Sequence, residues 1–195
     1  MMIFYIVKRM IDLLVSLTIL VFILSWLLPI LAILIKLDSR GPVFFRQKRT
    51  GCEAKTFDCF KLRTMSVNKN SDDLQAALND PRITRMGKFL RVSNLDELPQ
   101  FINVLLGHMS IVGPRPERRY YIQQIVQEAP YYCLLYKIRP GLTSWGPIRI
   151  GYSDSIEKMI ERLNYDIIYL ESMSLITDLK ILLLTLEIIF KGKGV

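Results

Sequence analysis

An uncharged apolar run near the N-terminus constrains this chain more than any other feature. Residues 13–35 contain no acidic or basic side chain over 23 positions. A run of this length can cross the hydrocarbon core of a bilayer as a single helix, and it is longer than a buried core helix needs to be. A signal peptide would have a shorter apolar region and a small-residue cleavage site, and neither is found here. We therefore expect residues 1–38 to be embedded in a membrane.

Basic residues flank this segment on both sides. Lys8 and Arg9 precede it, and five more cations follow it within a short distance: Lys36, Arg40, Arg46, Lys48 and Arg49. Because positive charge tends to remain on the cytoplasmic side, both ends are expected there, so the segment would enter the membrane and return. A kinked transmembrane helix is an alternative interpretation, and a buried core helix is a third.

A return to the same side requires a break in the helix, and the stretch "ILSWLLPILA" offers one. Pro29 removes a backbone donor and clashes with the preceding turn. Ser25 can bond a backbone group that such a break frees inside lipid. Trp26 favours the membrane interface, which suits a shallow turn. The predicted re-entrant helix therefore breaks at Ser25 and Pro29.

Residues 39–195 are expected to form one membrane-associated domain. Two β-prone runs, "VFF" and "KTFDCFKLRTM", favour a hairpin over the "RTGCEAK" turn. The polar stretch over residues 66–81 predicts a surface loop with a short helix. Helical patterns cover "LPQFINVLLG", which ends at Gly107, and residues 155–169, which carry an apolar stripe. The predicted fold class is α/β, mostly helical with a small β-sheet.

Residues 174–190 are strongly apolar but include Asp178, Lys180 and Glu187. Such a pattern is typical of a helix that lies on a membrane or on a core, and less of a second span. Interfacial amphipathic helices are therefore expected to accompany the N-terminal membrane helix.

The charge balance favours anionic partners. Lys and Arg number 26 against 18 acidic residues, a formal net charge of +8, which suits phosphates, acidic lipids or nucleic acid. The three cysteines form no CxxC pair or Cys/His cluster, so neither a disulfide framework nor a zinc site is expected. His108 is the sole histidine, and we assign it no role.

Two adjacent carboxylates, Asp96 and Glu97, lie in the stretch "RVSNLDELPQFINV". One interpretation is a helix start, in which Ser93 or Asn94 caps the helix and an acid follows at capping-box spacing. The other is a catalytic pair, a nucleophile beside a metal ligand. On local grounds alone the helix start is favoured.

The surroundings of the pair shift the balance toward catalysis. Arg91 precedes it, and Arg115 follows in a stiff Gly-Pro-Arg-Pro loop. Arginines keep a carboxylate ionised and match phosphate oxygens geometrically. Phosphoryl transfer needs such cations, usually with Mg²⁺, and no Walker-type or GxGxxG loop points to a nucleotide kinase or ATPase.

The chain resembles the monotopic bacterial phosphoglycosyl transferases, often described as sugar transferases. The matching stretches follow in order along nearly the whole chain: "KRMIDLL", "IKLDSRGPVFFRQKRTG", "FKLRTM", "DPRITRMGKFLR", "LDELPQFINVLLGHMSIVGPRPE", "RPGLTSW" and "DLKILLLT". The resemblance implies transfer of a sugar-1-phosphate from a UDP-sugar to polyprenyl phosphate, with release of UMP. It also implies a re-entrant helix and a place on the cytoplasmic face of the bacterial inner membrane.

By the same resemblance Asp96 attacks the sugar-bearing phosphorus to give an aspartyl-phosphosugar, and Glu97 helps to hold Mg²⁺ with Asp96. The family's basic and loop residues match further positions expected at the phosphates, which are Arg91, Pro114, Arg115, Lys61, Arg63 and Arg149. Arg149 is the loosest match, because the family often has "TGWAQVNGR" where this chain has "TSWGPIRIG". The family also often has Ser-Pro at the helix break, where this chain has Ser25 followed by Trp26.

A homodimer is possible, and no nucleic acid partner is expected. The rival interpretation is a membrane-tethered adaptor without enzymatic activity, which binds anionic lipid or nucleic acid through its basic face. Its support is the net charge and the three-residue spacing of basic residues over 82–91.

Overall fold

The computed structural model describes residues 2–67, 80–151, 153 and 155–191. The predicted surface loop over residues 66–81 lies mostly outside the described residues. In chain order the helices and strands are α1 (Met2–Ile19), α2 (Ser25–Asp38), β1 (Phe44–Thr50), β2 (Thr56–Leu62), α3 (Arg85–Val92), α4 (Gln100–Leu105), β3 (Ser110–Val112), α5 (Arg119–Glu128), β4 (Gly141–Thr143), α6 (Trp145–Ile150), α7 (Ile156–Glu171) and α8 (Leu175–Phe190). The prediction of a mostly helical chain is confirmed.

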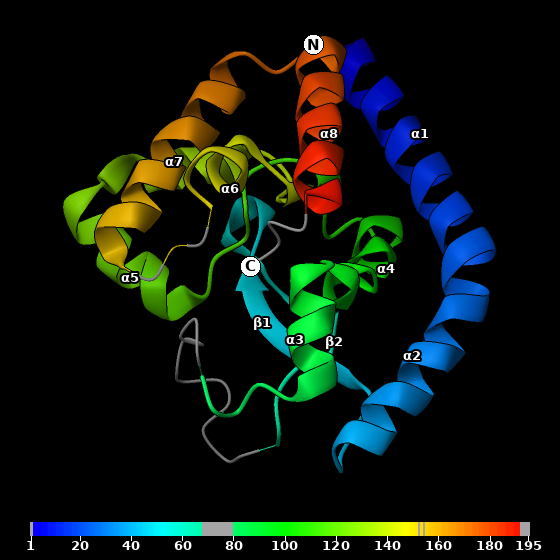
Figure 1. The fold of residues 1–195 in the computed structure, drawn as a ribbon. Coiled ribbons are helices and arrows are strands. Elements are labelled where there is room, and N and C mark those ends of the chain that lie inside the picture. The colour runs from blue at the N-terminus through cyan, green and yellow to red at the C-terminus, as the bar shows by residue number, and fades with distance from the viewer. Residues whose placement is uncertain (1, 68–79, 152, 154, 192–195) are drawn as a thin grey trace.

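The predicted membrane segment is one helix of 37 residues, Met2–Asp38, which is long and apolar enough to cross a membrane. A π-helical turn, Leu20–Leu24, joins α1 to α2, and the helix bends there (Figure 1). Ser25 Oγ donates to a carbonyl of this turn at 2.5 Å, and Trp26 Nε1 donates to another at 2.8 Å. Pro29 lies inside α2 without ending it. The bend therefore begins before the predicted break, and helical turns continue through it.

The N-terminal half of this helix is tied to the rest of the chain by polar contacts. Lys8 Nζ lies 2.5 Å from Asp178 Oδ2 in α8, and Asp12 Oδ1 accepts from the backbone N–H of Ile111 at 3.0 Å. Arg9 donates to two carbonyls at the end of α4. The stretch "KRMID" thus anchors α1 to three separate elements.

The C-terminal half is anchored by apolar packing. Leu31 and Ile35 of α2 form a buried cluster with Leu62 at the end of β2 and Leu90 in α3. Between the two anchors the outer face of the helix is apolar and exposed. Phe22 is 71% exposed, and similar side chains extend along the helix: Ile3, Ile6, Met10, Leu14, Leu17, Val21, Trp26, Ile30, Ile33 and Leu37.

The strands form two small sheets, where the sequence predicts one. Strands β1 and β2 pair antiparallel, from Phe44↔Leu62 to Thr50↔Thr56, which confirms the predicted hairpin. Strands β3 and β4 pair in parallel through Ser110↔Gly141. A parallel pair needs a long crossover, here α5 and a 3₁₀ segment, and strands of three residues leave almost no periodic signal in the sequence.

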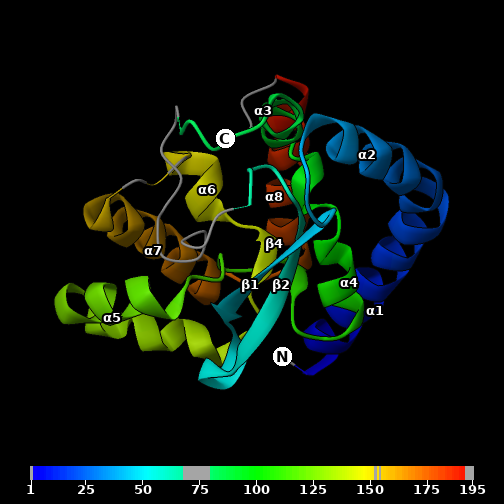
Figure 2. The ribbon, with the colours of Figure 1, turned by 90° about the horizontal axis from the view of Figure 1, so that it is seen from below.

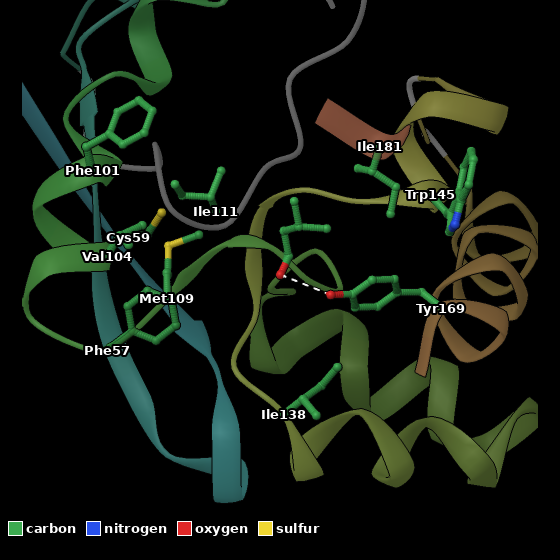
Figure 3. Close-up of a cluster of buried hydrophobic side chains, with 11 residues drawn as sticks. Phe57, Cys59, Phe101, Val104, Met109, Ile111, Ile138, Trp145, Tyr169 and Ile181 are labelled. Atoms are coloured by element: carbon green, nitrogen blue, oxygen red, sulfur yellow. Dashed lines mark hydrogen bonds between the residues drawn. The ribbon is translucent and has the colours of Figure 1, made fainter. Parts of the chain in front are cut away.

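The main hydrophobic core lies beside the hairpin. Helices α4 and α1 cover one side of the hairpin, and α5, α6 and α7 lie on the other (Figure 2). Buried side chains from β2, α4, α6 and α8 meet in one cluster, which includes Phe57, Val104, Trp145 and Ile181 (Figure 3). Tyr169 closes it, with its hydroxyl donating to Asp178 Oδ1 at 2.7 Å and lying 3.5 Å from the carbonyl oxygen of Val112.

Two predicted amphipathic helices are present as α7 and α8. Met159 and Leu163 of α7 are buried, in agreement with the predicted stripe. In α8, Ile181 is fully buried, whereas Ile176 is 81% exposed and Leu183 is 59% exposed. Helix α8 therefore packs on the core through one face and leaves a second apolar face uncovered among the described residues.

A glycine brings α3 against the chain that follows β2. A Cβ at Gly87 would lie 1.9 Å from the carbonyl oxygen of Thr64, a distance that no side chain can occupy. We expect Gly87→Ala to lower the free energy of unfolding by about 3 kcal/mol or more, because backbone must move on both sides of the contact. Chemical denaturation measures this loss, and Lys88→Ala, an exposed change at the next position, is the control. Equal stability of the two variants would contradict the prediction.

Candidate active site

The acidic pair lies in a 3₁₀ turn, Leu95–Glu97, between α3 and α4. Asn94 precedes it with a φ of 55°, and its side chain forms no capping bond with the described residues. Ser93 Oγ instead donates back to the carbonyl of Phe89 at 2.8 Å. The capping-box interpretation is therefore wrong, although both acids do lie in the first turn of a 3₁₀ segment.

Glu97 is held by two cations. Its Oε1 atom accepts from Lys61 Nζ at 2.6 Å and from Arg115 Nη2 at 3.3 Å. Burial alone would raise the pKa of Glu97, but the charges and hydrogen bonds of Lys61 and Arg115 outweigh burial and hold the pKa well below its usual value. Glu97 is therefore ionised at neutral pH.

Asp96 has a different environment from its neighbour. Asp96 is 8% exposed. Its carboxylate accepts no hydrogen bond from the described residues. Burial raises the pKa of Asp96 to about 6, and the charge of Glu97 adds to this, while Lys61, Arg91 and Arg115 act in the opposite direction. The result is a carboxylate with free oxygens, surrounded by cations. Such a group can attack an electrophile whose negative oxygens those cations attract.

Strand β2 and helix α4 bring Lys61 to the acidic pair. Along β2 the side chains of Phe57 and Cys59 point into the core, and Lys61 follows on the same face by the two-residue period of a strand. Asn103, fully buried in α4, accepts from the N–H of Phe60 at 2.9 Å and donates to the carbonyl of Asp58 at 2.7 Å. This amide fixes α4 on β2. Sequence reasoning missed it, because one Asn in an apolar helix has no distinctive pattern.

Arg91 reaches the site from α3. Its Nε donates to Thr64 Oγ1 at 3.0 Å, which fixes the guanidinium beside the segment that follows β2. Thr84 starts the helix as its cap, since its hydroxyl accepts from the N–H of Gly87 at 3.0 Å. The close approach at Gly87 thus serves the placement of Arg91.

The Gly-Pro-Arg-Pro loop is fixed from both sides. The carbonyl of Pro114 accepts from the N–H of Gly141 at 2.9 Å, next to the parallel pairing of β3 and β4. The N–H of Arg115 donates to Asp166 Oδ2 at 3.2 Å, and the other oxygen of Asp166 accepts from Gly146 at 3.2 Å. The predicted stiffness of this loop is therefore supported by contacts that hold Arg115.

A second acid supports this loop, and sequence reasoning missed it. Glu117 pairs with Arg49 Nη1 at 3.4 Å and with Arg162 Nη2 at 3.3 Å. Arg49 also donates to the carbonyl of Pro116 at 2.9 Å. Glu117 directly follows the Gly-Pro-Arg-Pro stretch, and Asp166 falls three residues after Leu163, on the buried face of the amphipathic helix α7. An acid in either position is a signal that could have pointed to this support.

Two residues predicted at the phosphates make other contacts in the structure. Arg63 is buried, and its guanidinium donates to backbone carbonyls at the end of α2, including Ser39 at 2.7 Å. Arg149 is exposed on α6, with its guanidinium 5.1 Å from the ring centre of Trp145. The structure thus brings together Lys61, Arg91, Arg115 and the acidic pair, whereas Arg63 contacts the end of α2.

A carboxylate pair set among Lys61, Arg91 and Arg115 in a small, mostly helical chain defines a candidate site for chemistry on a phosphate group. The chain belongs to the bacterial sugar transferase family, whose profile matches residues 3–192. It is 45% identical over 188 residues to a UDP-glucose:undecaprenyl-phosphate glucose-1-phosphate transferase of Klebsiella pneumoniae, covering 95% of this chain and 40% of that protein.

Two further relatives show the range of the family. One is a UDP-N-acetylgalactosamine-undecaprenyl-phosphate N-acetylgalactosaminephosphotransferase of Aeromonas hydrophila, 38% identical over 96% of this chain and 44% of the relative. The other is the exopolysaccharide production protein PSS of Rhizobium leguminosarum bv. phaseoli, 39% identical over 97% of this chain and 98% of the relative. The chain thus spans less than half of the first two relatives and nearly all of the third.

Proposed function

We propose that this protein transfers a sugar-1-phosphate from a UDP-sugar to a polyprenyl phosphate and releases UMP. The observation that carries the proposal is the unpaired, buried carboxylate of Asp96 among Lys61, Arg91 and Arg115. Relatives named for undecaprenyl phosphate as acceptor use UDP-glucose or UDP-N-acetylgalactosamine as donor, which supports the substrate class and leaves the sugar open.

In the first step, an oxygen of Asp96 attacks the phosphorus that carries the sugar. A bond forms between the carboxylate and this phosphorus, and the bond from phosphorus to the oxygen of UMP breaks, so UMP leaves with the bonding electrons. In this proposal Arg91 and Arg115 neutralise the diphosphate oxygens, which is supported by their charges beside Asp96. Cations fixed before the substrate arrives cost little reorganisation during the reaction.

In the second step, an oxygen of the polyprenyl phosphate attacks the same phosphorus and releases the carboxylate of Asp96. The product is a diphosphate that links lipid and sugar. Separating the reaction into two displacements lets one site serve a soluble donor and a lipid acceptor in turn.

Mg²⁺ fits this site as an ion shared with the substrate. Among residues 2–67, 80–151, 153 and 155–191, no three His, Cys, Asp or Glu side chains gather into a metal site. Mg²⁺ commonly binds through one or two carboxylates together with phosphates, which Asp96, Glu97 and the donor diphosphate could provide. When bound, the ion would add charge neutralisation at the diphosphate.

We also propose that residues 1–38 are a re-entrant membrane helix and that residues 39–195 form the catalytic domain on the cytoplasmic face. Lys8, Arg9 and Asp12 contact α8, α4 and β3, while the other end of the helix packs on β2 and α3. A spanning helix would separate its ends by about 30 Å of hydrocarbon and break one set of these contacts. Because both ends of the helix contact the same domain, we infer that the chain returns to the side of the membrane from which it entered.

Cysteine labelling tests this topology. In a background without the native cysteines, Ile3→Cys and Pro42→Cys should both react in inverted inner-membrane vesicles with a reagent that does not cross membranes. The reason is that both positions flank the helix on the same side. Labelling of one position in inverted vesicles and of the other only in intact spheroplasts would refute the re-entrant helix and leave the chemistry untouched.

Release of UMP tests the function directly. Purified protein mixed with undecaprenyl phosphate, Mg²⁺ and a panel of UDP-sugars should release UMP with at least one donor and form a lipid-linked sugar of matching mass. A tethered adaptor would release none with any donor. The panel also identifies the sugar.

The first step should depend on pH through Asp96. Because burial raises the pKa of Asp96 to about 6, its nucleophilic ionised form is lost as the pH falls through 6. We expect the rate of UMP release from donor alone to rise about tenfold between pH 5 and pH 7. Donor alone is used because the acceptor is a phosphate monoester that itself titrates near this pH. An inflection near pH 4, the ordinary value for an aspartate, would contradict the prediction.

A further inference from the structure

A cavity of about 480 Å³ lies apart from the candidate active site. Its walls are the first turns of α1, the turn between β1 and β2, and residues 137–139. Strand β2 runs from Phe57 in the cavity wall to Lys61 at the acidic pair, a separation of about 13 Å along a strand. Neither Lys61, Arg115 nor the acidic pair is among the described residues that line it. We call this space the α1 cavity.

Positive charge dominates the α1 cavity. Five cations line it against two carboxylates, Asp12 and Glu53. Both carboxylates are occupied, Asp12 by a backbone N–H and Glu53 by Lys55. In contrast, Lys137 has no ion-pair partner in the described part of the chain, and Arg139 uses only its Nε, which donates to a carbonyl at 3.0 Å. Cationic donors are therefore available to an anion.

A buried hydroxyl in the cavity wall also lacks a partner. Ser110 begins β3 and is 2% exposed, and its Oγ has no hydrogen-bond partner among the described residues. Buried polar groups are nearly always bonded, so an unbonded one calls for a ligand or a water. A phosphate oxygen is an acceptor that this hydroxyl can satisfy.

The cavity adjoins the exposed apolar surface of the membrane helix. Tyr5, Lys8 and Arg9 line it from one face of α1, while Ile6 and Met10, on the neighbouring face, are 53% and 65% exposed. A ligand with a phosphate in the cavity could therefore lay a hydrocarbon chain along α1. Basic pockets beside membrane helices on the cytoplasmic side typically bind anionic lipid headgroups.

We infer that the α1 cavity is a second phosphate-binding site, separate from the active site, which takes the headgroup of an anionic phospholipid. Lys137 and Arg139 bind the phosphate at the rim, and Ser110 donates to it from the floor. The site does not depend on the proposed transferase reaction, because none of its residues takes part in that reaction.

Lipid binding to the delipidated full-length chain in detergent tests the site, with native mass spectrometry as the readout. Dioleoyl phosphatidylglycerol should bind at least tenfold more tightly than dioleoyl phosphatidylcholine. The double variant K137Q/R139Q should lose most of this preference. Ser110→Ala should weaken binding about tenfold, the value of one hydrogen bond to a charged group, without lowering the melting temperature.

The control is R119Q/K158Q, which removes two exposed positive charges from α5 and α7 and should bind like the wild type. Equal affinity of the wild type and K137Q/R139Q for phosphatidylglycerol would overturn the site. Glycerol phosphate, a soluble competitor, distinguishes a site for a free phosphate ester from a site for a phospholipid headgroup. If glycerol phosphate bound as tightly as the phospholipid, the lipid assignment would be wrong.

Discussion

Asp96→Asn is expected to abolish UMP release, with a fall of about 10⁴-fold or more. The amide keeps the shape of the carboxylate but cannot attack phosphorus, and loss of a covalent nucleophile commonly has effects of this size. UMP release with donor and Mg²⁺ measures the loss. Intact-protein mass spectrometry after quenching should show a sugar-phosphate adduct on the wild type and none on the variant.

The folded protein should tolerate this change. Because burial raises the pKa of Asp96, its ionised form is less stable in the folded protein than in water at neutral pH. A neutral amide removes that cost, so we expect thermal stability at pH 7 to be equal or higher. Asp58→Asn, on a half-exposed residue of the same domain, is the matched control and should keep its activity. Near-normal activity of Asp96→Asn would end the nucleophile assignment.

Glu97→Gln is expected to lower the rate of the first step about a hundredfold. The change removes the negative charge that holds Lys61 and Arg115 in place. A hydrogen bond to a charged group contributes up to about 3 kcal/mol, and a loss of this size in the activation free energy lowers a rate about a hundredfold. The variant should also need more Mg²⁺ for half-maximal rate, because one carboxylate ligand is lost. Initial rates over a range of Mg²⁺ concentrations separate the two effects.

The pH profile of Glu97→Gln gives an independent check. The charge of Glu97 raises the pKa of Asp96, so its removal leaves the positive charges of Lys61, Arg91 and Arg115 less opposed. The inflection of the first step should therefore move from about pH 6 to a lower pH. Glu128→Gln, the same chemical change on the exposed end of α5, should leave both rate and inflection unchanged. A profile of Glu97→Gln that stays at the wild-type inflection would show that the two carboxylates do not interact.

The sequence predicted the residues that gather at the candidate site better than it predicted the residues that support them. Asp96, Arg91, Arg115 and Lys61 were all predicted, because the resemblance runs through continuous stretches that contain them. Asn103, which fixes α4 on β2, was missed, since its partners Asp58 and Phe60 lie more than 40 positions earlier in the chain. Long-range contacts of single polar residues leave no local pattern.

Arg63 makes contacts that its motif did not suggest. Its place in "FKLRTM" predicted a phosphate contact, and in the structure its guanidinium donates to the carbonyls at the end of α2. Strand β2 ends at Leu62, so the two-residue alternation that places Lys61 does not extend to Arg63. Residues of one short motif can therefore contact different parts of the molecule.

The sequence by itself determined that the N-terminal segment is a long apolar helix, that a hairpin follows, and that two carboxylates stand near arginines. Hydrophobic periodicity and residue type are local properties, and they suffice for such statements. Only the tertiary structure decided that Glu97 holds Lys61 and Arg115 while Asp96 has no ion-pair partner among the described residues, and that both ends of the N-terminal helix contact the rest of the chain. These outcomes depend on which distant groups meet, and burial and charge then set different pKa values for two acids that are adjacent in the chain.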